Sequence, residues 1–311
     1  MKDREMNVVF SSDNNYAQHM GVAIYSLLEN NKMFDKITIF IIDNQITYSN
    51  KEKLIDMVKK FSNSKIEWID FEHWKQRLNL NMGKWSISLS SYARLFLGSM
   101  LKNDVDRVLY LDCDMIVSQS LYELWNTCLS GKMLAAVQDS VNDTTKYMVE
   151  LKPEMRYFNA GMLLIDLKCW RAENMEKKCL DYIDKKNGNV VHHDQGVLNA
   201  IIRGNFERIP IKYNIMTIHY IMNKSSVMKY FGESAEFYKE EEIERAKQNP
   251  AILHFTPSFT SRPWISNCKH PLREIYWENI KKTPWRDAEK QRCTDKWYVR
   301  MINWKYRTLG V

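Results

Sequence analysis

Short aliphatic and β-branched runs alternate with helical patterns along most of this chain of 311 residues. The runs have the length and the composition of strands. This alternation is typical of a mostly parallel sheet with helices on its faces. We therefore predict an α/β fold built around a mixed, mostly parallel sheet. The predicted strands cover 8–10, 37–42, 66–69, 108–111, 134–137, 161–165 and 251–255, and the predicted helices between them cover 17–28, 50–61 and 91–101.

Later parts of the chain depart from this alternation. Residues 187–205 are typical of a loop followed by a helix, and residues 224–248 are polar, as expected of an excursion over the surface. After Pro271 the composition becomes basic and aromatic. Residues 269–311 carry eleven Lys or Arg against five Asp or Glu, which accounts for +6 of the net charge of +7. We therefore predict a main domain over residues 1–268 and a separate basic, aromatic and helical segment over residues 269–311.

Composition limits the class of protein. With 45% hydrophobic residues, the chain can bury a large core. No apolar run is long enough to cross a bilayer, and the charged start of the chain lacks the pattern of a signal peptide. The six cysteines are scattered without C-x-x-C spacing, which is typical of reduced thiols. These features predict a cytoplasmic protein.

Two carboxylates follow the apolar run 108–111 together, in the sequence Asp112-Cys113-Asp114. They are expected at the carboxyl edge of the sheet, where open α/β sheets bind nucleotide ligands. Paired carboxylate oxygens suit Mg²⁺ or Mn²⁺, which bind tightly only with further ligands such as substrate phosphates. The pair therefore favours a metal and diphosphate site. Taken alone, it is also the common pattern of a strand followed by acidic turn residues.

A histidine and an arginine further along the chain extend this hypothesis. His254 lies in the predicted strand 251–255, and Arg262 follows within a few residues. His254 would complete a metal shell, although a histidine at the end of a strand is more often a hydrogen-bonded core or surface residue. Arg262 is a fixed cation suited to bidentate phosphate binding, although most arginines in loops only meet solvent or a carboxylate.

The polar residues Asp13-Asn14-Asn15-Tyr16 follow the first predicted strand and face the same edge of the sheet. Their short side chains suit a base edge or a ribose hydroxyl, and they equally suit capping of the next helix by Asp13 or Asn14. The glycine-rich phosphate loops of dinucleotide-binding and P-loop folds are absent from the sequence. A nucleotide therefore needs a different binding solution in this chain.

Polar residues in the second half of the chain leave several interpretations open. His192-His193-Asp194 suggests a metal motif, but neighbouring side chains on an extended segment point to opposite sides, so we do not expect all three to reach one ion. Asp194-Gln195 suits either capping of a helix or presentation of a carboxylate and an amide to a sugar. Residues 159–161 likewise suit either a turn or an edge that faces a sugar.

Six separated blocks of the chain match one known family, in the order in which that family carries them. They are 9–16, 91–95, 108–114, 158–161, 193–199, and 254–256 together with 262–264. On these blocks the chain resembles the family 8 retaining glycosyltransferases, the bacterial lipooligosaccharide galactosyltransferases and their glycogenin relatives. The resemblance implies a Rossmann-like GT-A fold. It also implies transfer of a hexose from UDP-galactose or UDP-glucose to a hydroxyl of a glycan or lipid-linked oligosaccharide, with an α-linked product.

The resemblance further implies roles for the matching residues. The implied ligands of Mn²⁺, or of Mg²⁺, are Asp112, Asp114 and His254. The residues implied to bind the UDP-sugar are Asp13 and Asn15 near the uridine, Arg94 near the ribose and sugar, and Cys113, Asp139, Asn159 and Ala160, which with Asp194 and Gln195 line the donor pocket. Relatives usually carry His-x-x-Gly-x-x-Lys-Pro-Trp in the last block. Here Pro257 replaces the glycine, two extra residues intervene and Arg262 replaces the lysine.

Transfer of the sugar requires charge to be stabilised on both sides of the reacting carbon. Cleavage of the bond to UDP leaves negative charge on the diphosphate and positive character on the sugar ring. A divalent metal and Arg262 would stabilise the diphosphate in place of a general acid. Asp194 and Gln195 would stabilise the sugar carbon by charge and by an amide dipole, respectively. A covalent intermediate and attack by the acceptor from the face that UDP leaves both stay open.

The end of the chain, residues 295–309, predicts an amphipathic helix. Its basic stripe is formed by Lys296, Arg300, Asn303 and Arg307. Its broad aromatic side is formed by Trp297, Tyr298, Met301, Ile302 and Trp304. Such helices lie at anionic membrane surfaces. The alternative is a helix that packs its aromatic side on the main domain and leaves the basic stripe in water. Nucleic acid is not an expected partner, because the aromatics are bunched and no nucleic-acid motif accompanies them.

Two other classes of protein compete with a glycosyltransferase. A nucleotide-sugar nucleotidyltransferase would share the sheet and the metal, but the glycine-rich signature near its N-terminus is missing here. A catalytically silent nucleotide-sugar-binding partner or scaffold would keep the fold, and the filled metal-ligand positions disfavour it. We therefore expect a glycosyltransferase of bacterial surface polysaccharide synthesis, at the inner face of the membrane if the C-terminal helix binds lipid.

Overall fold

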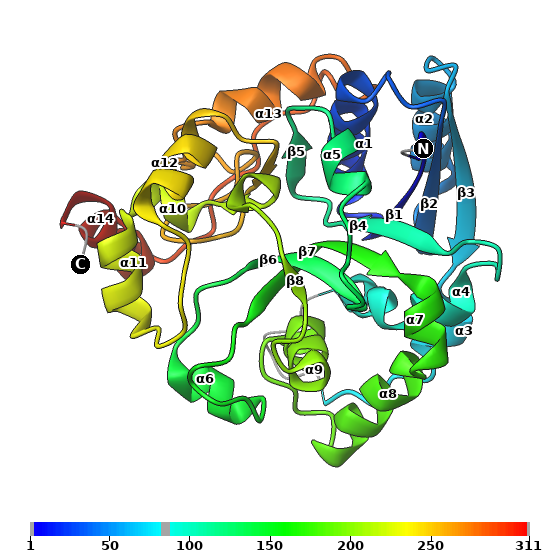
Figure 1. Ribbon diagram of the computed structural model, residues 1–311. Coiled ribbons are helices and arrows are strands. Elements are labelled where there is room, and N and C mark those ends of the chain that lie inside the picture. The colour runs from blue at the N-terminus through cyan, green and yellow to red at the C-terminus, as the bar shows by residue number, and fades with distance from the viewer. Residues whose placement is uncertain (1–2, 82–87, 310–311) are drawn as a thin grey trace.

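The computed structural model of the protein describes residues 3–81 and 88–309 (Figure 1). A seven-stranded sheet crosses the molecule. Its strands are β1 (Glu5–Asp13), β2 (Lys36–Asn44), β3 (Ser64–Asp70), β4 (Arg107–Leu111), β6 (Leu134–Gln138), β7 (Phe158–Asp166) and β8 (Glu207–Arg208), in the spatial order β3-β2-β1-β4-β7-β6-β8. Neighbouring strands are parallel except where β7 pairs with β4 and β6. The predicted α/β fold with a mixed, mostly parallel sheet is therefore confirmed.

A second, three-stranded sheet lies beside the first. It consists of β5 (Met115–Val117), β10 (Ile252–His254) and β9 (Ile215–Met216), with β10 in the middle. The predicted strand 251–255 is thus present as β10, and it belongs to this second sheet. The antiparallel register of β10 and β5 pairs His254 with Met115. This pairing brings a histidine from late in the chain next to the Asp112-Cys113-Asp114 turn.

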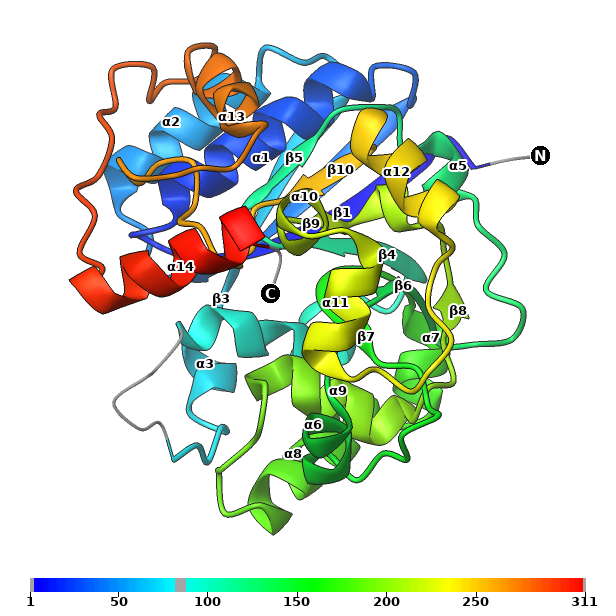
Figure 2. The same cartoon turned by 90° about the vertical axis from the view of Figure 1, so that its left-hand side faces the viewer.

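Helices surround both sheets (Figure 2). They are α1 (Ala17–Asn30), α2 (Tyr48–Val58), α3 (Glu72–Lys75), α4 (Leu97–Met100), α5 (Tyr122–Trp125), α6 (Asp143–Met148), α7 (Leu167–Ala172), α8 (Met175–Lys185), α9 (His193–Ile202), α10 (Ile218–Ile221), α11 (Lys224–Phe231), α12 (Glu240–Gln248), α13 (Arg273–Ile280) and α14 (Trp297–Leu309), with 3₁₀ segments η1 (Leu89–Phe96) and η2 (Ile211–Tyr213). None among the described residues is long and apolar enough to cross a membrane.

The predicted helix over residues 91–101 differs from the structure. The segment begins as the 3₁₀ helix η1 and becomes α-helical only in the short α4. Serine hydroxyls compete for the backbone at its start, because Ser88 Oγ accepts from the Ser90 amide and Ser91 Oγ donates to the Ser88 carbonyl. Such local bonds offer the backbone an alternative to the α-helical pattern.

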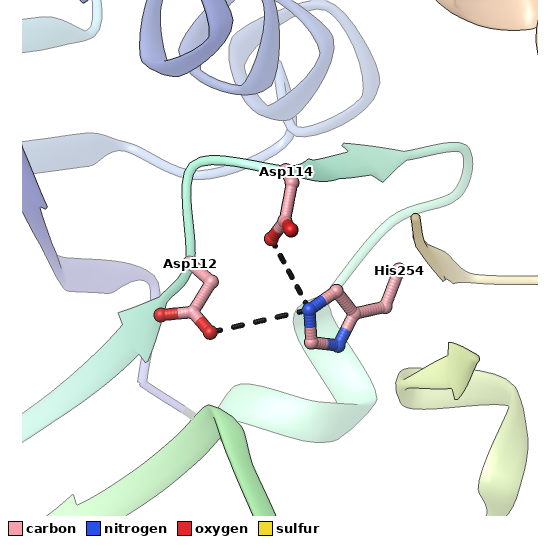
Figure 3. A group of neighbouring side chains, drawn as sticks. All are labelled: Asp112, Asp114 and His254. Carbon is pink, nitrogen blue, oxygen red and sulfur yellow. Dashed lines mark ion pairs between the residues drawn. The ribbon is translucent and has the colours of Figure 1, made fainter. Parts of the chain in front are cut away.

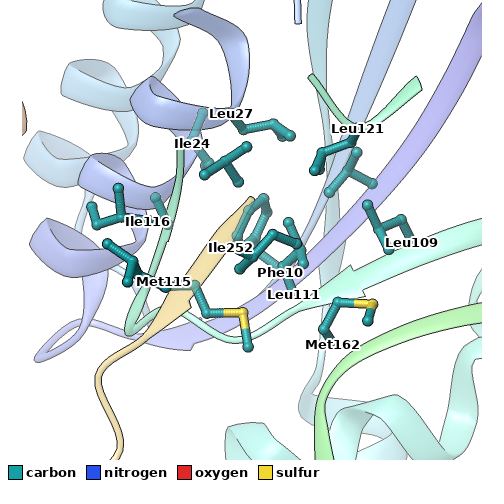
Figure 4. Packing of buried hydrophobic residues seen from close by; sticks show 14 of the residues in the cluster. Phe10, Ile24, Leu27, Leu109, Leu111, Met115, Ile116, Leu121, Met162 and Ile252 are labelled. Carbon is teal, nitrogen blue, oxygen red and sulfur yellow. The ribbon is translucent and has the colours of Figure 1, made fainter. Parts of the chain in front are cut away.

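Both faces of the main sheet are buried, which explains the continuous apolar runs of its strands. Successive side chains of a strand point to opposite faces. Val8 and Phe10 of β1 therefore pack in the core that contains α1 and α2, whereas Val9 packs in the core that contains η1, α7, α8 and α9. Figure 4 shows Phe10 and Leu109 from the main sheet and Ile252 from β10 packed against α1. The two sheets thus share one core on this side of the molecule.

Residues 224–248, predicted as a surface excursion, form α11, α12 and their connection. The connection is fixed by a buried ion pair between the Lys146 ammonium and the Glu233 carboxylate. Their side chains are 0% and 1% exposed, respectively. Lys146 also donates to the Pro153 carbonyl, and the Val141 amide donates to Glu233. Because a buried charge is costly without such partners, these contacts tie the excursion firmly to α6.

The C-terminal residues have two different environments. Tyr276 of α13 and the following Trp285 are buried in the core that contains α1, and an added Cβ on Gly21 of α1 would lie 2.3 Å from the Trp285 ring. By contrast, α14 lies at the edge of the molecule beside α11 (Figure 1). Residues 269–285 therefore share the main core, whereas α14 packs through Tyr306 on a separate, smaller cluster that includes Phe231 and Phe259.

The orientation of α14 tests one of the two sequence-based alternatives, whereas attachment to a membrane stays a prediction. Tyr306 packs on Phe259, with ring centroids 4.5 Å apart, and Arg307 Nη1 donates to the Phe259 carbonyl at 2.6 Å. The aromatic side, including Trp297 and Trp304, is exposed. The alternative in which this side packs on the domain is therefore wrong, because Tyr306 supplies the inward contact instead.

Candidate functional site

A cavity of about 800 Å³ opens at the carboxyl ends of β1 and β4. The chain runs outward from β1 to β2 and β3 and then returns to β4 on the other side of β1, so the cavity lies at a topological switch point of the sheet. Ligands of open α/β sheets bind in such crevices. The lining residues are Ser11, Ser12, Asp13, Tyr16, Ser88, Ser90, Ser91, Arg94, Tyr110, Asp112, Cys113, Asp114, Ala160, Gly161, His192, His193, Asp194, Gln195, Pro257, Ser258 and Arg262.

Three predicted metal ligands meet beside this cavity, which Asp112 and Asp114 line and His254 does not. Figure 3 shows Asp112, Asp114 and His254 turned toward one another. His254 Nε2 lies 3.1 Å from Asp114 Oδ1 and 4.0 Å from Asp112 Oδ2, and one ligand atom from each residue lies within 4.8 Å of the others. Among the described residues, this is the one group of three or more such side chains close enough to hold a metal ion.

The hydrogen-bond partners of His254 indicate which ring nitrogen faces the carboxylates as an acceptor. Asn159 Oδ1 is an acceptor, because the backbone amide of Gly161 donates to it. Asn214 therefore directs its side-chain nitrogen, Nδ2, at this oxygen and donates to it at 2.9 Å. Asn214 Oδ1 then faces His254 Nδ1 at 2.9 Å and accepts its proton. His254 Nε2 is thus the ring nitrogen that faces Asp112 and Asp114, and it can bind a cation when the imidazole is neutral. Two carboxylates and an imidazole nitrogen, oriented through the other ring nitrogen, match the ligands of a divalent cation.

Replacing Asn214 with Leu tests this orientation. The variant removes the acceptor that holds the proton on His254 Nδ1, and loss of such a supporting bond commonly weakens metal binding by about 10–100-fold. Mn²⁺ titration followed by electron paramagnetic resonance measures the change. Asn214→Asp is the matched control, because its carboxylate still accepts from Nδ1 and should retain more of the affinity. Equal affinities for the wild-type and Leu proteins would contradict the assignment.

A glycine on β7 permits the close approach of the ligands. An added Cβ on Gly161 would lie 2.5 Å from His254 Cε1 and 2.9 Å from Asp112 Oδ2. Real Cβ atoms do not approach ring or carboxylate atoms so closely, and both neighbours are predicted metal ligands. The Gly161 carbonyl also accepts from the Asp112 amide at 2.8 Å. Gly161 therefore sets the distance between the turn after β4 and the end of β10.

The electrostatics of the cluster favour the ionised form of Asp114. Burial opposes its ionisation, but His254 and Arg262 outweigh burial and hold the pKa of Asp114 below its ordinary value. Arg262 Nε donates to Asp114 Oδ2 at 2.9 Å. The guanidinium also lies 6.0 Å from the ring centroid of Tyr16 and 5.9 Å from that of Trp264. Arg262 thus lies at the cavity wall, beside the three predicted metal ligands.

Arg94 is buried beneath the cavity and joins two of the predicted carboxylates. Its Nη2 donates to Asp112 Oδ1 at 2.8 Å, its Nε lies 2.8 Å from Asp194 Oδ2, and its Nη1 donates to the Ala160 carbonyl. Burial alone would lower the pKa of Arg94, but the two carboxylates raise it above its ordinary value. Burial also raises the pKa of Asp194, and Arg94 opposes that shift. The guanidinium therefore orients both carboxylates, in addition to lining the cavity.

Asp194 and Gln195 lie in the first turn of α9, but they do not cap it, because the N-cap residue is His192 and no side chain caps this helix. Gln195 Oε1 accepts from the Ala160 amide at 3.0 Å, and Gln195 Nε2 donates to Asp139 Oδ2 at 3.1 Å. Asn159 Nδ2 donates to the same Asp139 oxygen at 3.1 Å. Asp139 and Asn159 do not line the cavity themselves. They instead fix the amide of Gln195, which does line it.

Asp13, in the turn after β1, lines the cavity, and its role in nucleotide binding stays a prediction. Asp13 Oδ1 accepts from the amides of Asn15 and Tyr16 at 2.9 and 3.3 Å, which fixes this turn, but the N-cap residue of α1 is Tyr16, so the predicted capping by Asp13 or Asn14 is wrong. Asn15 is exposed and lies outside the lining residues. Cys113 lines the cavity, donates its thiol proton to the Ser11 carbonyl and has a pKa raised by burial.

Two histidines that the sequence did not assign to the site also line the cavity. His192 and His193 both adopt left-handed backbone conformations, with φ of 56° and 54°. The segment is thus a tight turn and not the extended strand on which the sequence argument relied. His192 Nδ1 lies 3.1 Å from the Tyr157 hydroxyl, and His193 Nδ1 lies 3.4 Å from the Tyr92 hydroxyl. The argument from an extended segment is therefore wrong, and the expectation that His192, His193 and Asp194 do not bind one ion together stays a prediction.

Comparison with known proteins identifies the family. The family model described as glycosyl transferase family 8 matches residues 7–268. The chain belongs to this family. General stress protein A of Bacillus subtilis is 29% identical over 292 residues, which cover 91% of this chain and 96% of that protein. Lipopolysaccharide 1,2-glucosyltransferase of Escherichia coli is 26% identical over 285 residues, covering 91% of this chain and 79% of that enzyme.

Solved structures resemble this family 8 glycosyltransferase in fold as well. A crystal structure of the galactosyltransferase LgtC in complex with donor and acceptor sugar analogs superposes with a TM-score of 0.73. Sequence identity is 27%, and the superposition covers 90% of this chain and 96% of that one. The Rossmann-like GT-A architecture expected from the sequence is therefore confirmed.

Proposed function

We propose that this family 8 glycosyltransferase moves a hexose, galactose or glucose, from a UDP-sugar to a hydroxyl of a glycan or lipid-linked oligosaccharide. The observation that carries the proposal is the convergence of Asp112, Asp114 and His254 beside a large cavity at the switch point of the sheet. The similarity to LgtC and to a lipopolysaccharide glucosyltransferase supports a sugar donor and a glycan acceptor. Surface polysaccharide synthesis is the corresponding proposed pathway.

The proposed cofactor is Mn²⁺, with Mg²⁺ as the alternative. Two carboxylates and one imidazole acceptor would hold the ion, and diphosphate oxygens would complete its shell. When bound, the ion would act as a Lewis acid that neutralises charge on the leaving diphosphate. Around it, Arg94 keeps Asp112 in place through their 2.8 Å ion pair. The Asn214 amide keeps the imidazole oriented.

The remaining residues of the chain would act on the two halves of the donor. Arg262 at the cavity wall would bind the leaving diphosphate, because a guanidinium forms strong charge-assisted bonds to phosphate oxygens. Asp194 and Gln195 line the same cavity and would stabilise positive character on the sugar carbon. Asp139 would hold the amide of Gln195 in its orientation. Retention of configuration, and thus an α-linked product, belongs to this proposal.

Substitution of Arg262 tests its role as a phosphate ligand. Arg262→Gln removes the charge and should slow UDP release by about 10²-fold, the size of effect known for loss of one donor to a developing anion. Arg262→Lys keeps the charge and should recover much of the rate, with a weaker fit because a point charge replaces a planar fork. Rates of UDP release at saturating donor measure both. A Lys variant as slow as the Gln variant would contradict a role based on charge.

The proposed function is tested by UDP release from a panel of UDP-sugars, with Mn²⁺ and with a chelator. Slow hydrolysis of the donor needs no acceptor. We expect metal-dependent release from UDP-galactose or UDP-glucose, and an α-anomer in the transfer product by nuclear magnetic resonance. UDP binding without release from any sugar, and without transfer to any glycan acceptor, would favour the alternative of a catalytically silent binding partner.

The C-terminal helix supports a site of action at an anionic membrane surface. Its aromatic side is exposed, as a helix that lies in a membrane interface requires. A lipid-linked acceptor would be presented at that surface. Membrane attachment would then bring the cavity of the enzyme to its acceptor.

A further inference from the structure

The outward side of α14 concentrates large apolar side chains. Trp297, Met301 and Trp304 follow one another at helical spacing and are 72%, 54% and 58% exposed, and Tyr298 and Ile302 beside them are exposed as well. A monomeric protein rarely exposes so many large apolar side chains on one short element without a partner for them. Exposed lysines, Lys296 and Lys305, are interspersed with these side chains. The surface therefore combines apolar and cationic groups.

A second feature lies on the inner side of the same helix. A cavity of about 200 Å³ separates α14 from the segment 260–269. Three cations line it together with hydroxyl and amide groups, and the lining residues are Thr260, Ser261, Asn267, Lys269, Arg300, Asn303 and Arg307. A water molecule takes up about 30 Å³ in the liquid, so the cavity has room for a group several times as large.

The charges of this cavity are not balanced within the protein. Among the described residues, Lys269, Arg300 and Arg307 form no ion pair with a carboxylate. A nearby carboxylate, that of Asp295, accepts from Ser261 Oγ at 3.3 Å and from Asn267 Nδ2 at 3.4 Å. Arg300 Nε donates to the Asp295 backbone carbonyl, and Arg307 Nη1 to the Phe259 carbonyl. Each guanidinium therefore keeps further donors, and the site retains an excess of positive charge.

We propose that this cavity binds the phosphate of an anionic phospholipid head group, while the outward side of α14 lies in the interfacial layer of the membrane. Guanidinium, ammonium, hydroxyl and amide donors together match the oxygens of a phosphate monoanion. The aromatic side chains match the boundary between head groups and acyl chains, where amphipathic helices bury their apolar side. Helix α14 would thus contact both the phosphate of the lipid and the boundary with its acyl chains.

The position of the cavity gives this site a consequence for transfer, which rests on the proposed function. The loop after β10 separates the lipid site from the donor cavity, with Pro257, Ser258 and Arg262 lining the donor cavity and Thr260 and Ser261 lining the lipid site. Phe259 lies between them in a left-handed conformation, φ 56°, and packs on Tyr306 of α14. A lipid held by α14 would therefore hold the loop that carries Arg262 and place the donor cavity beside the membrane.

Vesicle binding by the full chain tests the proposal. Sedimentation with phosphatidylglycerol-containing vesicles and with phosphatidylcholine vesicles should show binding to the anionic vesicles alone. The double variant Lys269→Gln/Arg300→Gln should weaken this binding by about tenfold or more, given the usual contribution of each cation at an anionic surface. The matched control is Lys60→Gln/Arg286→Gln, which removes the same charges from exposed positions elsewhere and should weaken binding by no more than about twofold.

Further arms separate the lipid from other occupants. Inorganic phosphate should displace the wild-type protein from vesicles more than chloride of equal ionic strength does. Equal losses in the two double variants would mean unspecific surface charge and would overturn the site. Binding of phosphate without binding to vesicles would also overturn it. So would a protein that does not bind vesicles and instead forms a dimer in solution, if Trp297→Ser/Trp304→Ser dissociates that dimer. These readouts use neither donor nor acceptor, so they stand apart from any failure of the proposed transfer. Thermal unfolding temperatures of the variants close to that of the wild-type protein would confirm that they fold.

Discussion

Asp112→Asn is expected to lower UDP release from a UDP-sugar by at least about 10³-fold, or about 4 kcal/mol of transition-state stabilisation. The substitution keeps the shape of the side chain and removes its charge. Asp112 is both a predicted ligand of the ion and an ion-pair partner of buried Arg94. Its loss therefore weakens the metal shell and leaves the guanidinium with one carboxylate instead of two. Rates of UDP release at saturating Mn²⁺ measure the effect.

The matched control is Asp287→Asn, the same chemical change at a carboxylate whose side chain is 95% exposed. It should release UDP at the wild-type rate. Near-normal turnover of Asp112→Asn with metal present would remove Asp112 from the metal site. We expect Asp112→Asn to unfold at a temperature close to that of the wild-type protein. If Asp112→Asn does not fold, Asp114→Asn replaces it in the same assay.

Gly161→Ala is expected to weaken Mn²⁺ binding by about 10²-fold or more, because no room exists for the added methyl group between the metal ligands. The Cβ would lie 2.5 Å from the His254 ring and 2.8 Å from Met115 Cε. Either the imidazole or the backbone of β7 must move, and both movements separate His254 from the carboxylates. Mn²⁺ titration by electron paramagnetic resonance measures the affinity.

Gly98→Ala is the control for this variant, because it adds the same methyl group at another tight position. Its Cβ would lie 3.0 Å from Trp170 Cδ1, away from the residues that line the donor cavity. The control should keep the affinity for Mn²⁺ even if its stability falls. An unchanged affinity in Gly161→Ala would mean that the ligands do not need this close approach.

Local patterns in the sequence predicted much of the fold. Both faces of the sheet are covered, so its strands read as continuous apolar runs, and the turns that follow β1 and β4 carry the short polar residues that line the cavity. The helix expected over 91–101 was partly wrong because its serine hydroxyls bond to the backbone and favour a 3₁₀ start. Very short strands such as β9 had no periodic signal, since two residues cannot show a period of two.

The parts of the site that the sequence did not reveal depend on contacts between distant segments. Asn214 follows the short η2 and has no motif, yet its amide orients His254 through a bond across 40 residues. The roles of Asp139 and Asn159 as supports of Gln195, and of Arg94 as a link between two carboxylates, likewise arise only when β6, β7, η1 and α9 meet. The positive φ values of His192 and His193 could not be read from residue type, because non-glycine residues seldom adopt them, even though histidine does so more often than most.

The network of hydrogen bonds and ion pairs suggests how the site avoids reorganisation during the reaction. Asp112, Asp194 and the imidazole of His254 each have a partner within the protein that fixes their position. Such preorganised groups cost no rearrangement when charge develops in the transition state. Each partner is buried or half-buried, so solvent does not compete strongly for these bonds.

Binding of Mn²⁺ to the purified chain in the presence of UDP, counted by electron paramagnetic resonance, tests the central claim most directly. The geometry predicts one ion for each chain in the wild-type protein, and loss of that ion in Asp114→Asn with UDP and protein concentrations unchanged. The same stoichiometry and affinity in Asp114→Asn as in the wild-type protein would contradict a metal centre formed by Asp112, Asp114 and His254.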